Sequence, residues 1–341
     1  MKELVANFTG QLKEALQIAQ NAKITPLNKK IDNVVITGLG GSGIGGTILT
    51  DWCKETCPVP IITNKDYHLP AFAGEHTLVV VSSYSGNTEE TLQAANEALE
   101  LGATVVAVTS GGELQKMAKQ HGFDVIIVPG GNPPRGMLVY SLIQLLAYFN
   151  AFGFFQVNLD QTVGEIVNHV EKHESEIKKQ ASEIAHFLHQ SSPYIYTVEG
   201  YAGLGIRTRQ QINENAKMLC NAHVIPEMNH NELVGWVGHP KDIAVLIFRN
   251  EDEDPRNVKR VEINEEIMRR YTSEVMQVYS KGSNRVVRTF YHIHLGDWVS
   301  IYLAELNGAD PVEIEVIDYL KGELSKFSQW VWKRYGLKIW V

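Results

Sequence analysis

Cysteines and long apolar runs are both scarce in this chain of 341 residues. The three cysteines, Cys53, Cys57 and Cys220, are odd in number and too few for a disulfide framework. Cys53 and Cys57 are four apart on a predicted helix, but no further Cys/His pair has the spacing of a structural zinc site. No run of 18 apolar residues is available to span a bilayer. The sequence therefore predicts no membrane partner and a reduced, cytoplasmic location.

An excess of positive charge is absent as well. The chain has 31 Lys and Arg residues against 39 Asp and Glu residues, a formal net charge of −8. This balance argues against a general nucleic-acid surface, so any phosphate group must be held by a local site. The chain is 44% hydrophobic, enough for a sizeable core, and its length favours two domains of about 150 residues each.

The first half of the sequence alternates between strand and helix patterns. An amphipathic helix, not a signal peptide, is predicted over 2–22. Strands are predicted at 33–37, 61–63, 78–81, 104–109 and 125–129, and helices at 44–53, 89–101, 113–121 and 135–149. Such alternation is typical of an α/β domain with a doubly wound, flavodoxin-like parallel sheet. This domain is expected to cover residues 1–153.

The second half repeats this pattern after a polar helical connector at 160–190. Strands are predicted at 194–198, 243–248, 274–278 and 289–294, and helices at 207–219, 255–271 and 297–307. A second parallel-sheet domain is therefore expected over 154–323. The remaining tail, 324–341, contains Trp330, Trp332 and Trp340, and we expect it to pack on the body or on a partner subunit.

A hydroxyl-rich loop follows the predicted buried strand near residue 80. The segment 79–91 reads VVVSSYSGNTEET, so the loop lies between a strand and the start of a helix. Backbone N–H groups at a helix start lack partners and attract anions. Ser83, Ser85 and Thr88 could join those amides, while Gly86 lets the backbone bend close to a ligand. The alternative is a hydroxyl-rich turn with no ligand.

A glycine-rich loop follows the first predicted strand. Gly38, Gly40 and Gly43 satisfy the G-x-G-x-x-G pattern of dinucleotide-binding proteins, which makes a nicotinamide-dependent dehydrogenase the main alternative. That pattern requires an acidic residue near the end of the second strand. The first acidic residue after the strand predicted at 61–63 is Asp66, which comes behind two non-acidic residues, so the match to the dinucleotide pattern is loose. A dinucleotide site would also leave the hydroxyl-rich loop unexplained.

Several motifs in order give the chain a resemblance to a known family. The pattern S-x-S-G-N-T resembles the sugar-phosphate loop of sugar isomerase (SIS) domains, and GLGGSGIGG at 38–46 is similar to their first loop. NPPRGMLVYSL (132–142), NENAK (213–217), PEMNHNELVGW (226–236) and DYLKGEL (318–324) then follow as in the bifunctional phosphoglucose/phosphomannose isomerases. The resemblance covers about residues 1–324. It implies two SIS-type domains and cofactor-free conversion of glucose 6-phosphate or mannose 6-phosphate into fructose 6-phosphate.

The resemblance also implies roles for single residues. It assigns the substrate phosphate to Gly41, Ser42, Ser83, Ser85 and Thr88. It assigns Glu214 as the base that moves a proton between C1 and C2, and Arg135 as the cation that stabilises the enediolate. It assigns ring opening to His230, because histidine as a residue type can both donate and accept a proton near neutral pH, and it gives Lys321 an assisting role. Without the resemblance, the four catalytic candidates, Glu214, Arg135, His230 and Lys321, would each be interpreted as an ordinary solvated or structural side chain.

The same resemblance implies a homodimer, because the family's ring-opening histidine comes from the neighbouring subunit. It also implies a small hydroxyl residue seven positions before the lysine, where this chain has Ile314. This departure from the family's pattern weakens the expectation of activity on mannose 6-phosphate but not that of activity on glucose 6-phosphate. A non-catalytic SIS sensor of sugar phosphates is a further alternative, although the sequence has no recognisable DNA-binding appendage.

One histidine pair invites a metal interpretation. His292 and His294 are two apart on the strand predicted at 289–294, so they would face the same side. A catalytic zinc needs three protein ligands, and no nearby third ligand is evident. No metal is therefore predicted there or elsewhere.

Overall fold

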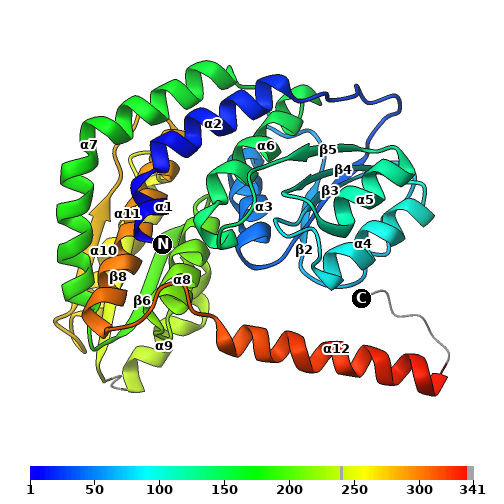
Figure 1. Cartoon of the computed structure of the whole chain (residues 1–341). Coiled ribbons are helices and arrows are strands. Elements are labelled where there is room, and N and C mark those ends of the chain that lie inside the picture. Colours follow the sequence, from blue (N-terminus) through cyan, green and yellow to red (C-terminus); the bar gives the residue numbers. More distant parts are fainter. Residues whose placement is uncertain (239–240, 336–341) are drawn as a thin grey trace.

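The computed structural model describes residues 1–238 and 241–335, with the side chains of the last helix described as far as residue 327. Figure 1 shows two α/β halves, each built on a parallel sheet, joined by long helices. Both predicted parallel sheets are thereby confirmed. None of the described helices is long and apolar enough to cross a membrane.

The N-terminal sheet has five parallel strands in the order β2-β1-β3-β4-β5. They are β1 (Asn33–Thr37), β2 (Ile61–Asn64), β3 (Thr77–Ser82), β4 (Thr104–Thr109) and β5 (Asp124–Ile127). All six residues of β3 are buried, as expected for a central strand covered by helices on both faces. The helices around this sheet are α2 (Phe8–Asn21), α3 (Gly40–Cys53), α4 (Glu89–Glu100), α5 (Gly112–His121) and α6 (Leu138–Ala151), while the short helix α1 (Lys2–Ala6) contacts a helix of the C-terminal half.

Helix α3 begins at Gly40, four residues before the predicted start. A β-carbon on Gly43 would lie 2.1 Å from the carbonyl oxygen of Gly38. Glycine at 43 therefore lets the helix begin directly after β1, in a space that no other residue fits. The glycine-rich loop is thus the first turn of a helix, with its free N–H groups at the carboxyl end of the sheet.

The C-terminal sheet has four parallel strands in the order β7-β6-β8-β9. They are β6 (Ser192–Val198), β7 (Asn221–Ile225), β8 (Ile243–Arg249) and β9 (Val275–Tyr279). Its helices are α8 (Ala202–Ala216), α9 (Glu232–Gly235), α10 (Pro255–Met268) and α11 (Arg285–Asn307), with short 3-10 turns η2 (Glu227–His230) and η3 (Trp236–Gly238). Strand β7 was not predicted, because its sequence NAHVI has no clear alternation.

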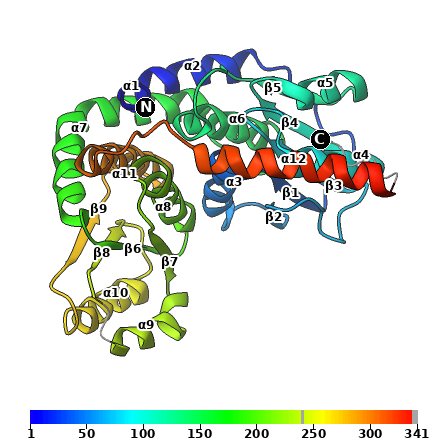
Figure 2. The same cartoon turned by 60° about the horizontal axis from the view of Figure 1, so that its bottom comes forward.

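The strand predicted at 289–294 is wrong. These residues lie inside α11, which is buried on nearly every side between residues 286 and 304. A helix buried all round has no polar stripe, so its short apolar stretches cannot be distinguished from a buried strand by periodicity. α11 packs beside the long helix α7 (Leu159–Leu188), as Figures 1 and 2 show.

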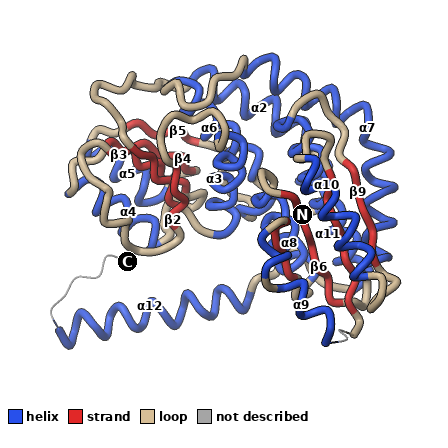
Figure 3. Tube along the Cα trace, turned by 180° about the vertical axis from the view of Figure 1, so that it is seen from behind, coloured by secondary structure: helices blue, strands red, loops and turns tan. Residues whose placement is uncertain are grey.

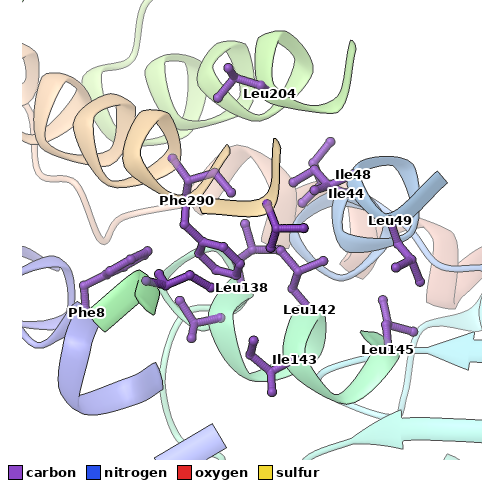
Figure 4. Close-up of a cluster of buried hydrophobic side chains, with 14 of the residues drawn as sticks. Phe8, Ile44, Ile48, Leu49, Leu138, Leu142, Ile143, Leu145, Leu204 and Phe290 are labelled. Atoms are coloured by element: carbon purple, nitrogen blue, oxygen red, sulfur yellow. The ribbon is translucent and has the colours of Figure 1, made fainter. Parts of the chain in front are cut away.

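One hydrophobic core joins the two halves. Figure 4 shows part of it, where Ile48 of α3, Leu142 of α6, Leu204 of α8 and Phe290 of α11 meet. A β-carbon on Gly203 would lie 2.9 Å from the backbone nitrogen of Ile48, so α3 and α8 touch almost backbone to backbone. Each of these apolar side chains contributes about 1.5–3 kcal/mol when buried. The shared core therefore fixes how the carboxyl ends of both sheets face each other.

Helix α12 (Glu315–Tyr335) leaves the C-terminal half as a separate rod, as Figures 1 and 3 show. Every side chain from 315 to 327 is exposed. Residues 324–327 are the part of the predicted tail whose side chains the structure describes, and packing of the tail on the body or on a partner subunit stays a prediction. Trp330, Trp332 and Trp340 lie outside the described side chains.

Candidate active site

The hydroxyl-rich loop after β3 has a fixed backbone. The N–H of Ser83 donates to the carbonyl oxygen of Val108, 3.1 Å away, and the N–H of Leu114 donates to that of Gly86 at 2.9 Å. Gly86 has a φ of +68°, and a β-carbon there would lie 1.9 Å from the carbonyl oxygen of Gly111. Only glycine fits at position 86, so the loop is held between β4 and the start of α5.

The three hydroxyls of this loop gather at the start of α4. Thr88 is the N-cap residue, yet its side chain makes no capping hydrogen bond. Its Oγ1 accepts from Ser83 Oγ at 3.2 Å, while Ser85 is exposed and its Oγ accepts from the N–H of Asn87 at 3.2 Å. Uncapped N–H groups beside hydroxyl donors form a suitable site for a phosphate.

The glycine-rich loop lies against the hydroxyl-rich loop. Ser42 Oγ accepts from the N–H of Tyr84 at 2.9 Å, and the carbonyl oxygen of Ser42 accepts from Ser82 Oγ at 2.9 Å. A β-carbon on Gly41 would lie 3.0 Å from the backbone nitrogen of Arg135. The first turn of α3 therefore contacts both the candidate phosphate loop and the candidate catalytic arginine.

The acidic residue that a dinucleotide site would need has another role. Asp66 follows β2, and its carboxylate accepts from the N–H of Tyr67 at 2.7 Å. The carbonyl oxygen of Asp66 accepts from the side-chain amide of Asn64 at 3.0 Å. Asp66 thus closes its own turn, which agrees with the loose match to the dinucleotide pattern.

Arg135 lies on the 3-10 turn η1 (Pro134–Gly136) and only 2% of it is exposed. Its guanidinium points into the C-terminal half, where Nε donates to Asn215 Oδ1 at 2.7 Å and Nη1 to Glu214 Oε2 at 3.2 Å. Nη2 donates to the carbonyl oxygen of Pro311 at 2.6 Å. Burial lowers the pKa of Arg135, while the charge of Glu214 opposes this. A guanidinium stays protonated despite such a shift.

Glu214 lies in the last turn of α8. The next turn is fixed by Lys217, which has a φ of +56° and whose Nζ donates to the carbonyl oxygens of Glu214, Asp310 and Glu313 at 2.7, 2.9 and 2.7 Å. Glu214 lines a hollow of about 280 Å³, and Ile314 lines the same hollow. The structure therefore joins a partly exposed carboxylate, which can accept a proton, to a buried guanidinium, which can stabilise a nearby negative charge, across the two halves.

The structure does not bring His230 to this pair. His230 ends η2 and is exposed. Its segment is tied to the sheet through Glu232, whose carboxylate contacts His223 Nδ1 at 2.5 Å and accepts from the hydroxyl of Tyr196. His230 therefore faces outward from a well-supported turn.

Lys321 is also not brought to the pair. It is exposed on α12, and it is absent from the wall of the hollow beside Glu214, which ends at Ile317. The two predicted ring-opening residues are thus exposed, whereas the predicted base and enediolate cation form one contact within the chain.

His292 and His294 do not form a metal pair. On a helix, residues two apart point to nearly opposite sides. His292 Nε2 lies 3.1 Å from the carbonyl oxygen of Arg249, and burial lowers the pKa of His292 to about 4. His294 Nε2 instead lies 2.7 Å from Glu174 Oε2. Among the described residues, no group of three His, Cys, Asp or Glu side chains could hold a metal ion.

Sequence reasoning missed three polar residues around this site. Asn215 bonds Arg135 directly, and Arg207 and Asp297 form a buried ion pair at 3.0 Å beside it. One signal was available, since Asp297 is an isolated charge within the apolar run 290–304 and such a charge is buried only with a partner. Its partner, 90 positions away, could not be identified without the fold.

Comparison with known proteins agrees with this architecture. A family model described as "SIS domain" matches residues 27–152, and one described as "Bacterial phospho-glucose isomerase C-terminal SIS domain" matches residues 177–324. The chain is similar in fold to a solved hypothetical protein from Thermus thermophilus, with a TM-score of 0.75, 15% identity, and coverage of 95% of this chain and 90% of that one. It is also similar to tagatose-6-phosphate ketose/aldose isomerase from Escherichia coli, with a TM-score of 0.69, 13% identity, and coverage of 92% and 95%.

Two curated relatives are much more similar in sequence. Both are named bifunctional phosphoglucose/phosphomannose isomerase. The protein from Caldicellulosiruptor bescii is 39% identical over 96% of this chain and 100% of its own length. The protein from Thermoplasma volcanium is 37% identical over 87% of this chain and 92% of its own length. The chain therefore belongs to the family of bifunctional phosphoglucose/phosphomannose isomerases.

Proposed function

We propose that this protein interconverts glucose 6-phosphate and fructose 6-phosphate, and also mannose 6-phosphate and fructose 6-phosphate, as an aldose–ketose isomerase. One observation carries the proposal. The Glu214 carboxylate lies 3.2 Å from the buried Arg135 guanidinium, at the meeting point of the two halves. The names of the relatives and the family of the chain support the same reaction.

The substrate phosphate binds at the start of α4. Ser83, Ser85 and Thr88 donate hydroxyl hydrogen bonds, together with N–H groups of the helix start. Ser42, with the backbone at Gly41, completes the grip from the first turn of α3. We assign the phosphate-binding residues to the domain at 1–153 and the catalytic base to the domain at 154–323. We assign no catalytic group to the tail at 324–341.

Glu214 moves one proton between two adjacent carbons. Its carboxylate takes the proton from C2 of the open-chain aldose and returns it to C1, passing through an enediolate. Arg135 stabilises the negative charge that develops on the C1 and C2 oxygens. The reaction is redox-neutral within one molecule, so it consumes no nicotinamide.

Ring opening requires groups that the catalytic pair does not supply. We assign it to His230, with Lys321 assisting. Since His230 is exposed on the outer side of η2, we infer that it acts in the site of a second copy of this chain, in a homodimer. The protein is expected to work in the cytoplasm.

Ile314 limits the choice of substrate. It lines the same hollow as Glu214, and a branched apolar side chain offers no hydrogen bond to a sugar hydroxyl. We therefore expect turnover of mannose 6-phosphate to be slower than turnover of glucose 6-phosphate.

A coupled assay tests the proposal. Protein treated with EDTA should convert fructose 6-phosphate into glucose 6-phosphate, followed through glucose-6-phosphate dehydrogenase. No turnover with tight binding of fructose 6-phosphate would indicate a sugar-phosphate sensor instead. Saturable binding of NADH in a fluorescence titration would indicate a dehydrogenase.

A further inference from the structure

A closed ring of buried hydrogen bonds surrounds Arg135. On one side, Arg207 Nη2 of α8 donates to the backbone carbonyl oxygen of Arg135 at 2.6 Å. The same nitrogen contacts the Asp297 carboxylate of α11 at 3.0 and 3.1 Å. Arg207 and Asp297 are 1% and 6% exposed, so this ion pair is sealed from water.

The ring closes on the other side of Arg135. Arg135 Nε donates to Asn215 Oδ1 at 2.7 Å, and Asn215 Nδ2 donates to Ser300 Oγ at 2.9 Å. Ser300 Oγ donates to the backbone carbonyl oxygen of Asp297 at 2.7 Å. The bonds therefore run from the guanidinium of Arg135 through α8 and α11 and back to its own backbone.

We propose that Arg207 and Asp297 are positioning residues for isomerisation, which hold Arg135 at a fixed distance from Glu214. This inference rests on the proposed function. Arg135 belongs to the N-terminal half and Glu214 to the C-terminal half, so their separation is set by the contacts between halves. The ring is such a contact, because Asn215 follows Glu214 directly and Arg207 lies on the same helix.

Stability alone does not explain the ion pair. Nε and Nη1 of Arg207 have no partner among the described protein atoms. A buried guanidinium with two unpaired nitrogens is costly, and apolar residues of similar size usually replace such a pair without loss of stability. What apolar residues cannot supply is the bond to the carbonyl oxygen of Arg135. That bond restricts the 3-10 turn that bears the arginine.

The test is a charge-free double variant, Arg207→Met with Asp297→Asn. It keeps the volume of both side chains, and Asn can still accept the 2.7 Å bond from Gln211 Nε2. We expect kcat for fructose 6-phosphate to fall about 10–100-fold, because a displacement of about 1 Å has effects of this size. KM should change less than threefold, since the phosphate loops are untouched.

A matched control is a second buried ion pair of the C-terminal half, Arg249 with Glu253, whose side chains are 4% and 1% exposed. Arg249→Met with Glu253→Gln removes equal charge, but this pair bonds Gln277 and Asn250 and not Arg135. Its kcat should stay within twofold of the wild type. An equal fall in kcat in both double variants would overturn the proposal, and so would a folded Arg207/Asp297 variant with wild-type kcat.

Two single variants cover the case in which the double variant fails to fold. Ser300→Ala removes two bonds of the ring, those of Ser300 Oγ with Asn215 and with Asp297, and should lower kcat about threefold to tenfold at unchanged KM. Arg207→Lys keeps the charge and can still donate to Asp297, so it should retain more of kcat than Arg207→Met. Wild-type kcat in Ser300→Ala, or equal kcat in Arg207→Lys and Arg207→Met, would contradict the proposal. The wild-type assay separates these results from failure of the proposed function itself.

Discussion

The turn from β3 to α4 and the turn from β8 to α10 occupy equivalent places in the two sheets, since β3 lies beside β1 as β8 lies beside β6. In the C-terminal half, Asp254 caps α10 by accepting from the N–H of Arg256 at 2.8 Å. Glu253 of the same turn accepts from the N–H of Asn250 at 2.6 Å. In the N-terminal half, Thr88 leaves α4 without a side-chain cap.

The difference shows how one architecture yields a binding turn or a structural turn. A helix start attracts negative charge whether it comes from a ligand or from the protein. At the cap position itself, the C-terminal half has the carboxylate of Asp254, whereas the N-terminal half has the neutral hydroxyl of Thr88, with Glu89 and Glu90 following in the first turn of α4. The N–H groups at the start of α4 are therefore without a side-chain cap, which supports the phosphate site proposed there, and the proposed base lies at the end of α8 in the other half.

The largest effect is expected for Glu214→Gln, which tests whether chemistry belongs to the C-terminal half. Removing the base should lower kcat roughly 10²–10⁴-fold. Binding of fructose 6-phosphate, measured by calorimetry, should change little. Glu305→Gln is the control, because Glu305 is exposed and bonds only Lys2 among the described ion pairs. Full activity of Glu214→Gln would assign the base to another residue.

Thr88→Asp tests the phosphate turn, because it gives α4 the kind of cap that α10 has. The new carboxylate should occupy the helix start and repel the substrate phosphate. KM for fructose 6-phosphate should rise about 100-fold, the loss of a charge-assisted bond plus repulsion. Thr88→Val, which removes the hydroxyl without adding charge, should raise KM about tenfold. Unchanged KM in both variants would show that the substrate phosphate does not bind at this turn.

Asp254→Ala tests the structural turn. Loss of the α10 cap should lower the free energy of unfolding by about 1 kcal/mol. The kcat and KM for fructose 6-phosphate should stay at wild-type values, which is the reverse of the pattern for Thr88→Val. Denaturant unfolding and the coupled assay measure the two quantities. A raised KM with unchanged stability would indicate that the turn before α10 binds substrate, as we propose for the turn before α4.

A pH dependence of stability is expected from Asp51, which joins the halves by accepting from the N–H of Gly203 at 2.7 Å. Burial raises its pKa to about 6, with Glu199 acting in the same direction and Lys54 and Arg285 against it. The folded state thus holds this proton more tightly than the unfolded state. The free energy of unfolding should therefore fall as the pH rises from about 4 to about 6.

Asp51→Asn should flatten that part of the stability curve, because an amide does not titrate and still accepts from Gly203. Denaturant unfolding at several pH values measures the slope. An unchanged slope in Asp51→Asn would mean that another group carries it.

The sequence predicted the two sheets and the position of the hydroxyl-rich loop between β3 and α4 better than it predicted the residues around Arg135 and Glu214. The run Leu78–Val81 and the loop at 82–87 are contiguous, so local rules apply to them. Helix α11 was mistaken in part for a strand because burial on all sides removes its periodicity. The ring of Arg207, Asp297 and Asn215 depends on contacts between residues up to 90 positions apart, which patterns within a short stretch of sequence cannot predict.

The most direct measurement of the central claim is hydrogen exchange at the sugar carbons. Fructose 6-phosphate is incubated with the protein in D₂O, and deuterium at C1 is followed by NMR. The account predicts incorporation by the wild type, and at least about a 100-fold slower rate in Glu214→Gln that still binds the sugar. Incorporation at the wild-type rate in Glu214→Gln would contradict it.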